Sequence, residues 1–328
     1  CLKNFDNNSS NLLIFNISFR FLYSKSNKMI DVKNQFVFEK NTIEVFIKRE
    51  DLIHPFISGN KYRKLKYNLL QAKVENQTAL LTFGGAFSNH IAAVAFAGKE
   101  NNFKTIGIIR GDELRDKIQE NPTLRFAQEN GMTFEFVSRN DYSNKENPEF
   151  IEQLRQKFGR FYLVPEGGTN DLAVKGCEEI LIEEDSQFDY ICCAVGTGGT
   201  ISGLINSALP HQKVLGFPAL KGDFLQEEIC KFAKTDNWKL ITEYHFGGYG
   251  KIDLELINFI NNFNESNNIP LDPVYTSKMA FGVLDLIAKN YFPSNSKILM
   301  IHTGGLQGIQ GMNQLLEKKQ LPKITTNV

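Results

Sequence analysis

The order of apolar and polar positions along the chain predicts short buried strands that alternate with helices. Apolar runs of strand length are followed by longer stretches in which apolar residues recur at helical spacing. We expect strands at residues 44–48, 78–82, 104–110, 133–137, 162–165, 188–195, 214–217, 239–242 and 297–302. We expect helices at residues 60–74, 91–99, 121–130, 148–158, 171–182, 201–208, 253–262 and 277–289. This order is typical of βαβ units and predicts an α/β fold with a largely parallel sheet.

Glycine-rich turns follow four of the predicted strands. They cover residues 83–90, 166–170, 196–200 and 303–308. Each of them alone could be an ordinary turn. Because open α/β sheets bind ligands at the carboxyl ends of their strands, the four turns together predict a binding site at that edge.

The turn at residues 196–200 carries the strongest physical signal. It joins a near-continuous apolar strand to a helix and contains Gly196, Thr197, Gly198, Gly199 and Thr200. Backbone amides and hydroxyls at the start of a helix can converge on a phosphate. The spacing differs from that of nucleoside triphosphatases and of dinucleotide-binding proteins, so the turn predicts a short phosphate monoester. The alternative is a tight turn that binds nothing.

Lys61 lies at the expected start of the helix over residues 60–74. We expect Asn60 to be the N-cap, because its side chain can accept from free amides of the first turn. A lysine at this place can lose part of its solvation and become an amine that condenses with an aldehyde cofactor. Taken alone, the Asn-Lys pair is better interpreted as an exposed basic helix start.

Three further polar stretches have both a structural and a functional interpretation. Ser88 is either a proton-handling hydroxyl or the N-cap of the next helix, and His90 is expected to be structural. Residues 272–278 read as a capped helix entry with Tyr275 packed into the core. The segment around Tyr249 is either a mobile loop or a glycine-loosened turn.

Composition excludes several classes of function. The 37 basic and 37 acidic residues among 328 give no net charge, so neither nucleic acid nor a membrane surface is expected as the main partner. Five cysteines without a repeating pattern favour a reducing cytoplasm, and we interpret Cys192 and Cys193 as buried small hydrophobes. No spacing of metal ligands is present, which predicts no catalytic metal. Residues 1–28 are rich in asparagine and serine and are expected to be a disordered or non-native extension.

The motifs, taken in order, resemble one family of enzymes. They read Ser-Gly-Asn-Lys61-x-Arg-Lys64, Gly-Gly-x-x-Ser88-Asn89-His90, Glu-Gly-Gly-x-Asn170, Gly196-Thr-Gly-Gly-Thr200, Asp-Pro-Val-Tyr275-Thr276-x-Lys and His302-Thr303-Gly-Gly. This series resembles the 1-aminocyclopropane-1-carboxylate deaminase and D-cysteine desulfhydrase family, whose fold is that of tryptophan synthase β-like enzymes. The resemblance implies pyridoxal 5'-phosphate as cofactor, a small amino acid as substrate and a homodimer.

The same resemblance implies a fold with two lobes and assigns roles to the motif residues. The lobes would be open, twisted, mostly parallel sheets flanked by helices, with residues 29–79 and 161–328 forming the large cofactor-binding domain and residues 80–160 the small one. Lys61 would hold the cofactor covalently and shuttle protons, and Lys64 would contact its phosphate. The other implied site residues are Asn89 at the cofactor ring, Ser88 near the substrate, the phosphate cup Gly196, Thr197, Gly198, Gly199 and Thr200, and the tyrosines Tyr275 and Tyr249.

Thr276 and Thr303 distinguish the branches of this family. In the deaminase branch these positions carry a glutamate at the pyridine nitrogen and a leucine, whereas two threonines resemble the desulfhydrase branch. A neutral hydroxyl makes the cofactor ring a weaker electron sink, which suffices for β-elimination. We expect D-cysteine to give pyruvate, sulfide and ammonia, with Lys61, Ser88 or Tyr275 taking the α proton. The alternatives are the deaminase, another β-elimination or β-replacement enzyme, and a non-catalytic amino-acid sensor.

Overall fold

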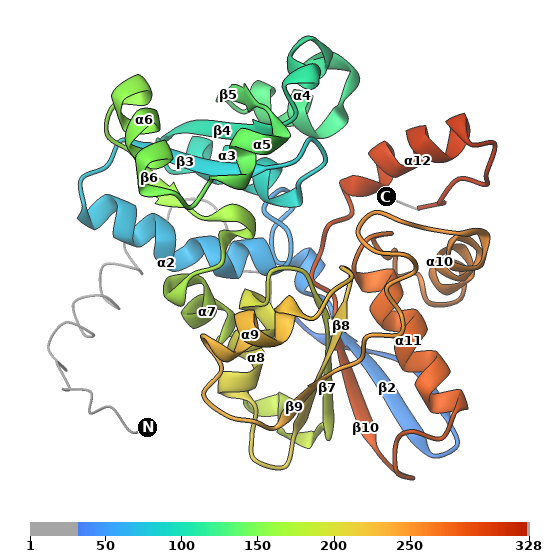
Figure 1. Ribbon diagram of the computed structural model, residues 1–328. Coiled ribbons are helices and arrows are strands. Elements are labelled where there is room, and N and C mark those ends of the chain that lie inside the picture. Colours follow the sequence, from blue (N-terminus) through green and yellow to red (C-terminus); the bar gives the residue numbers. More distant parts are fainter. Residues whose placement is uncertain (1–31, 327–328) are drawn as a thin grey trace, which may run out of the picture. The chain divides into compact units, whose positions relative to one another are not determined.

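The computed structural model of the protein describes residues 32–326. The extension expected at residues 1–28 lies outside the described residues. Within residues 32–326 the chain forms two sheets (Figure 1). Their strands are β1 (Asn34–Lys40), β2 (Ile43–Lys48), β3 (Ala79–Gly84), β4 (Lys104–Arg110), β5 (Met132–Val137), β6 (Tyr162–Val164), β7 (Tyr190–Val195), β8 (Lys213–Pro218), β9 (Trp238–Leu240) and β10 (Lys297–Ile301).

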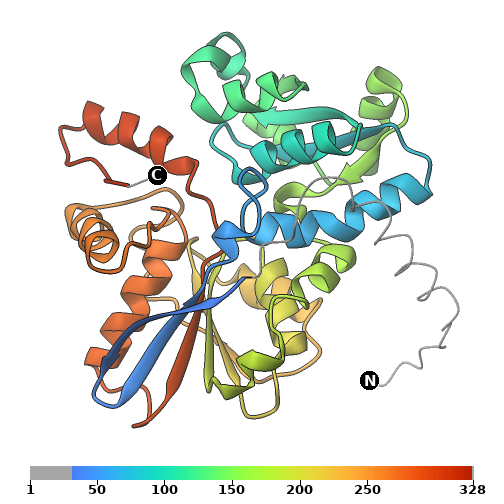
Figure 2. The same cartoon turned by 180° about the vertical axis from the view of Figure 1, so that it is seen from behind.

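The larger sheet has six strands in the order β1-β2-β10-β7-β8-β9. All its pairs are parallel except β1 with β2, which form an antiparallel hairpin at one edge. Figure 2 shows the blue strand β2 beside the red strand β10, which come from opposite ends of the described chain. The last strand in the sequence therefore occupies the middle of the sheet.

The smaller sheet has four parallel strands in the order β5-β4-β3-β6. Its edge strand β6 begins at Tyr162, just beyond the boundary near residue 160 that we predicted for the small domain. The division into two domains stays a prediction. The two mostly parallel sheets and their helices confirm the predicted α/β fold class.

Helices cover both sheets, and their bounds are as follows. They are α2 (Asn60–Val74), α3 (Asn89–Glu100), α4 (Pro122–Glu129), α5 (Arg139–Ser143), α6 (Pro148–Phe158), α7 (Asp171–Cys177), α8 (Gly199–Ser207), α9 (Phe224–Cys230), α10 (Leu254–Asn267), α11 (Thr276–Ala288) and α12 (Gly308–Lys318). Short 3-10 helices occur at η1 (Glu50–Leu52), η2 (Asp112–Glu120), η3 (Glu166–Gly168) and η4 (Glu183–Gln187). Within residues 32–326, no helix combines the length and apolar character needed to cross a membrane.

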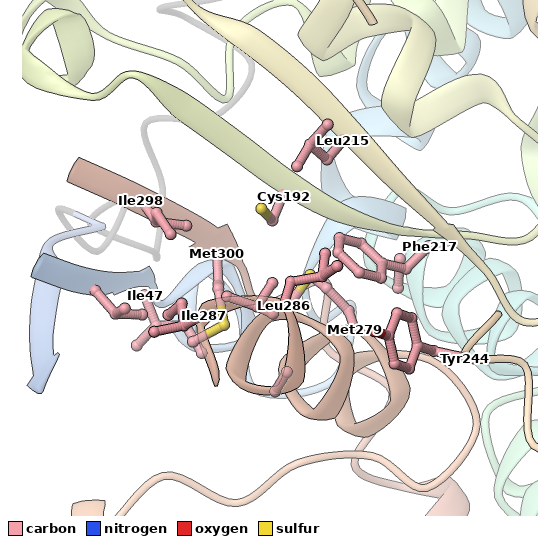
Figure 3. Packing of buried hydrophobic residues seen from close by; sticks show 14 of the residues in the cluster. Ile47, Cys192, Leu215, Phe217, Tyr244, Met279, Leu286, Ile287, Ile298 and Met300 are labelled. Carbon is pink, nitrogen blue, oxygen red and sulfur yellow. The ribbon is translucent and has the colours of Figure 1, made fainter. Parts of the chain in front are cut away.

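Buried apolar side chains fill both faces of the larger sheet. Figure 3 shows Met279, Leu286 and Ile287 of α11 packed against Phe217, Met300 and other residues of the strands. A second cluster on the opposite face contains side chains of α8 and α9. Cys192 belongs to the first cluster and Cys193 to the second, because successive strand residues point to opposite faces. Both are fully buried, which confirms their interpretation as small hydrophobes.

Two elements differ from the prediction in ways that matter for packing. The helix expected over residues 171–182 ends at Cys177, because the chain turns there to bury Ile180 and to bring Glu179 to Lys66 of α2. The hairpin strand β1 was not predicted, since its only apolar run is the short stretch at residues 36–38 and none of its residues is fully buried.

Candidate active site

Lys61 lies in the first turn of α2, at the carboxyl end of the larger sheet. The N-cap of this helix is Gly59, and no side chain caps it, so the expected capping role of Asn60 is wrong. The Asn60 side chain instead donates to Thr200 Oγ1 at 2.8 Å and accepts from Lys61 Nζ at 3.2 Å. It lies one position inside the helix, where it joins α2 to the start of α8.

Gly59 approaches the turn after β10 so closely that only glycine fits. Its backbone has a φ of 61°, and a Cβ there would lie 2.6 Å from Gly304 N and closer still to the carbonyl of Thr303. The same carbonyl accepts from Asn60 N at 3.2 Å. The turn that carries Lys61 is therefore fixed against the last strand of the chain.

Lys64, which is buried, and Lys61, which is half-buried, share one face of α2. Burial, followed by the charge of Lys64, lowers the pKa of Lys61 to about 7. Burial also lowers the pKa of Lys64, whose ammonium contacts Gly167 O at 3.1 Å and Thr169 Oγ1 at 3.0 Å. Residues three apart in a helix are neighbours, so the two ammonium groups repel one another. An anion placed between them would relieve this repulsion.

Neither lysine has a carboxylate as an ion-pair partner among residues 32–326. A buried and a half-buried ammonium group side by side without a counter-charge are unfavourable, because charges withdrawn from water are normally paired. The local chemistry therefore fits an anionic group. A phosphate ester that also carries an aldehyde would satisfy Lys64 through its phosphate and Lys61 through its carbonyl carbon.

The turn at Gly196–Thr200 could provide the amides for such a phosphate. Gly198 has the left-handed conformation, with a φ of 84°, and helix α8 begins at the next residue. The first amides of α8 have no carbonyl partner within the helix and point out of its N-terminus. Thr197 Oγ1 lies 3.4 Å from Lys64 Nζ and 2.6 Å from Thr169 Oγ1. The turn and Lys64 are thus in direct contact.

Thr169 is a site residue that the sequence analysis did not select. A Cβ on Gly199 would lie 2.8 Å from its hydroxyl, so the turn after β6 packs directly on the cup. Its position inside the predicted glycine-rich turn at residues 166–170 was the only signal available. The contact brings the smaller sheet's β6 turn to the larger sheet's β7 turn.

Helix α3 begins with Asn89, beside the turn that follows β10. Ser88 is its N-cap and accepts from Ile91 N at 3.4 Å, while a part for its hydroxyl in proton transfer stays a prediction. A Cβ on Gly305 would lie 2.7 Å from Asn89 Nδ2, so Asn89 lies against the turn after β10. His90 is buried and shares a hydrogen bond of 2.8 Å with Thr82 Oγ1, as expected of a structural histidine.

Tyr275 faces the phosphate cup from the start of α11. A Cβ on Gly196 would lie 3.1 Å from its ring. Burial, followed by the nearby Tyr249, raises the pKa of Tyr275 well above its usual value, so its hydroxyl keeps its proton. The rings of Tyr249 and Tyr275 meet edge to face with centroids 6.0 Å apart. The second tyrosine expected from the preceding loop thus lies beside the first.

Asp272 organises the start of α11. One carboxylate oxygen accepts from the amides of Val274 and Tyr275 at 2.9 and 2.8 Å, and the other from Thr276 N at 2.7 Å. The Thr276 hydroxyl donates to the same carboxylate at 2.6 Å and is fully buried. Asp272 was missed as a site residue because the sequence offered only its helix-entry position.

Thr303 completes the set of predicted residues. It is buried, and its carbonyl lies at the backbone contact with Gly59 and Asn60. The structure thus brings Lys61, Lys64, Asn60 and the residues of the phosphate cup into one connected group, with Tyr275 and Tyr249 on its other side.

Comparison with known proteins gives a consistent result. The model of the pyridoxal-phosphate dependent enzyme family matches residues 32–304. A Pyrococcus furiosus protein named putative 1-aminocyclopropane-1-carboxylate deaminase is 32% identical over 292 residues, which cover 81% of this chain and 85% of that protein. The bifunctional D-cysteine desulfhydrase/1-aminocyclopropane-1-carboxylate deaminase of Arabidopsis thaliana is 30% identical over 300 residues, covering 82% of this chain and 74% of that protein. A solved structure described as an ACC deaminase homologue matches with a TM-score of 0.76 and 26% identity, covering 91% of this chain and 98% of that one.

Proposed function

Because this chain belongs to the pyridoxal-phosphate dependent enzymes, we propose that it removes a β substituent from a small amino acid, with D-cysteine as the substrate. Bound pyridoxal phosphate supplies an aldehyde that condenses with amines and a ring that accepts electrons from Cα. The observation that carries the proposal is the pair of lysines, Lys64 buried and Lys61 half-buried, beside the phosphate cup. One of them has a pKa of about 7, so a large part of its amine is unprotonated at neutral pH.

Each residue of the site has a proposed task. Lys64 and the turn at Gly196–Thr200 would bind the phosphate, and Asn89 would lie at the ring. Lys61 would hold the cofactor and, once displaced by the substrate's amine, could take the α proton. Ser88 is a second candidate for that proton. Tyr275 remains protonated and could donate to the departing sulfur.

The balance of the reaction is simple. Loss of the proton at Cα and of thiolate from Cβ converts D-cysteine into an enamine, which water hydrolyses. One water is consumed, and pyruvate, sulfide and ammonia are released without any oxidant. The fully buried Thr276 offers a neutral hydroxyl instead of a carboxylate, and this hydroxyl already donates to Asp272. A neutral group at the ring nitrogen suits an elimination in which the electrons leave promptly.

The second candidate is 1-aminocyclopropane-1-carboxylate deaminase. It is favoured by the names of the Pyrococcus and Arabidopsis relatives. A product panel separates the two reactions: sulfide and pyruvate from D-cysteine, against ammonia and 2-oxobutyrate from the cyclopropane substrate. Far better turnover of the latter would refute the D-cysteine assignment. Exchange of Thr276 and Thr303 for glutamate and leucine should lower desulfhydrase activity.

The lysine assignment has its own test. Lys61→Ala should abolish the visible absorption of the covalently held cofactor, whereas Lys66→Ala should retain it. Lys66 lies on the same helix, but its ammonium forms an ion pair with Glu179. An unchanged absorption band in Lys61→Ala would refute the assignment. A protein that binds the cofactor but turns over neither substrate would instead be a sensor.

We also propose that the protein is a cytoplasmic homodimer. The four cysteines of the described part of the chain are free thiols, which suits a reducing compartment. The dimer rests on the family resemblance. Light scattering coupled to gel filtration gives the mass directly, and a monomer at micromolar concentration would contradict the proposal.

A further inference from the structure

The segment between β9 and α10 lies along helix α11. We call residues 244–249 the strap. The Tyr244 hydroxyl donates to Asp285 Oδ2 at 2.6 Å, and the Tyr244 ring lies close to α11, in the cluster of Figure 3. Phe246 meets Phe281 edge to face with ring centroids 5.0 Å apart. The strap therefore contacts two successive turns of the helix before it reaches the site.

Tyr249 is the end of the strap that enters the site. Its ring meets that of Tyr275, the residue before α11, with centroids 6.0 Å apart. Tyr249 is 46% exposed, so packing alone holds it weakly. Something other than burial must fix the direction in which this ring points.

Lys278 occupies the helical turn between Phe281 and Tyr275. Its side chain is 1% exposed, and its ammonium donates to His245 O at 2.9 Å and to Gly248 O at 2.8 Å. Burial lowers the pKa of Lys278 to about 8, while the charges of Asp272 and Asp253 raise it. The ammonium is therefore charged near neutral pH, and two strap carbonyls supply its hydrogen bonds.

The strap needs such a contact because its own backbone is permissive. Phe246, Gly247 and Gly248 all have positive φ angles, as does Gly250 just beyond the strap. Glycine loses more conformational freedom on ordering than any other residue. Two carbonyls that converge on one ammonium fix the bend between His245 and Gly248, and Tyr249 is the next residue.

We propose that Lys278 is a positioning residue that holds Tyr249 against Tyr275 through the carbonyls of His245 and Gly248. The inference rests on the proposed place of Tyr249 in the active site. It assigns to Lys278 no contact with substrate or cofactor. Its effect on turnover passes through the strap, so removal of the Tyr249 ring must cancel it.

A double-mutant cycle tests this coupling. Lys278→Met should lower kcat/KM about tenfold when Tyr249 is present and less than twofold in the Tyr249→Ala background. Lys278→Arg keeps a charged donor and should recover most of the loss. Lys318→Met removes an exposed charge from the last turn of α12 and should leave kcat/KM within about twofold of the wild type. Equal losses from Lys278→Met in both backgrounds would mean a merely structural role and would overturn the proposal.

Hydrogen exchange gives a second readout that needs no substrate. Peptides covering residues 244–251 should exchange about tenfold faster in Lys278→Met than in the wild type or Lys318→Met. Unchanged exchange would overturn the proposal, whatever the substrate proves to be. A wrong substrate assignment, by contrast, would appear as absent turnover with faster strap exchange. If Lys278→Met does not fold, Lys278→Gln enters the same cycle and the same exchange measurement, with the same criteria.

Discussion

Replacing Gly59 by alanine should disable the active site, and the chain contains a matched control. Gly59 has φ and ψ angles of 61° and −142°, and Gly159 at the end of α6 has angles of 76° and −152°. Both conformations are nearly restricted to glycine, and another residue there costs about 1–3 kcal/mol. Gly159→Ala therefore carries the same conformational cost, but its Cβ would meet nothing within 4 Å.

The difference between the two variants is a collision. At Gly59 the Cβ would lie 2.6 Å from Gly304 N and closer to Thr303 O, whereas ordinary contact begins at 3.4 Å. The backbone of α2's first turn must then move from the β10 turn by roughly 1 Å, and a misplacement of that size can cost about 10²-fold in rate. Lys61 is two residues away and moves with it.

Two measurements separate the effects. Thermal unfolding should show a loss of a few degrees for Gly159→Ala and a larger loss for Gly59→Ala, because the collision adds to the conformational cost that the two share. The kcat/KM should fall about 10²-fold in Gly59→Ala and stay within a few-fold of the wild type in Gly159→Ala, and the absorption band of the held cofactor should weaken only in the former. Equal activity in the two variants would refute the argument that the close approach sets the position of Lys61.

Three further outcomes follow from the charges of the described residues. Lys64→Met should weaken cofactor binding about 10- to 100-fold, as expected for loss of a charged hydrogen bond, while Lys66→Met should leave the dissociation constant nearly unchanged. Because the pKa of Lys61 is lowered, the folded apoenzyme binds fewer protons than the unfolded chain between about pH 7 and 10.5. In denaturant titrations, its free energy of unfolding relative to that of Lys61→Met should therefore rise with pH in that window, by at most about 1.4 kcal/mol per pH unit. A difference that does not change with pH would contradict the lowered pKa. The buried Lys48 ammonium lies 2.7 Å from the Asp185 carboxylate, and Asp185→Asn removes this counter-charge. The free energy of unfolding should therefore fall by about 3–5 kcal/mol. A loss below about 1 kcal/mol would contradict a charged buried pair.

The sequence predicted the elements whose signals are local. Helix α6 over Pro148–Phe158 and strand β4 over Lys104–Arg110 have the predicted bounds, because Asn147 caps α6 with proline next to it and β4 is a buried apolar run between polar ends. Helix α2 also has the predicted bounds. The order of helices and strands then led to the α/β fold.

Contacts made by tertiary packing could not be predicted in the same way. Asn60 is a residue type that often occupies N-cap positions. Its side chain instead donates to Thr200, and the N-cap of α2 is Gly59. Thr169 reaches the site through its contact with Lys64, and Asp272 through the turn after β10, where a Cβ on Gly305 would lie 3.3 Å from the Asp272 carboxyl carbon. Local spacing carries no record of such partners.

The central position of β10 in the larger sheet has a consequence for folding during synthesis on the ribosome. Lys61 leaves the ribosome roughly 240 residues before Thr303, which at 5–20 residues per second is on the order of 10–50 s. Until then β2 and β7 lack the strand that lies between them, and the Gly59 turn lacks its support. A chain that ends before residue 297 lacks β10, so the hairpin β1-β2 and the strands β7-β8-β9 of the larger sheet would not be joined. Retention of the cofactor would therefore mark a chain whose synthesis has been completed.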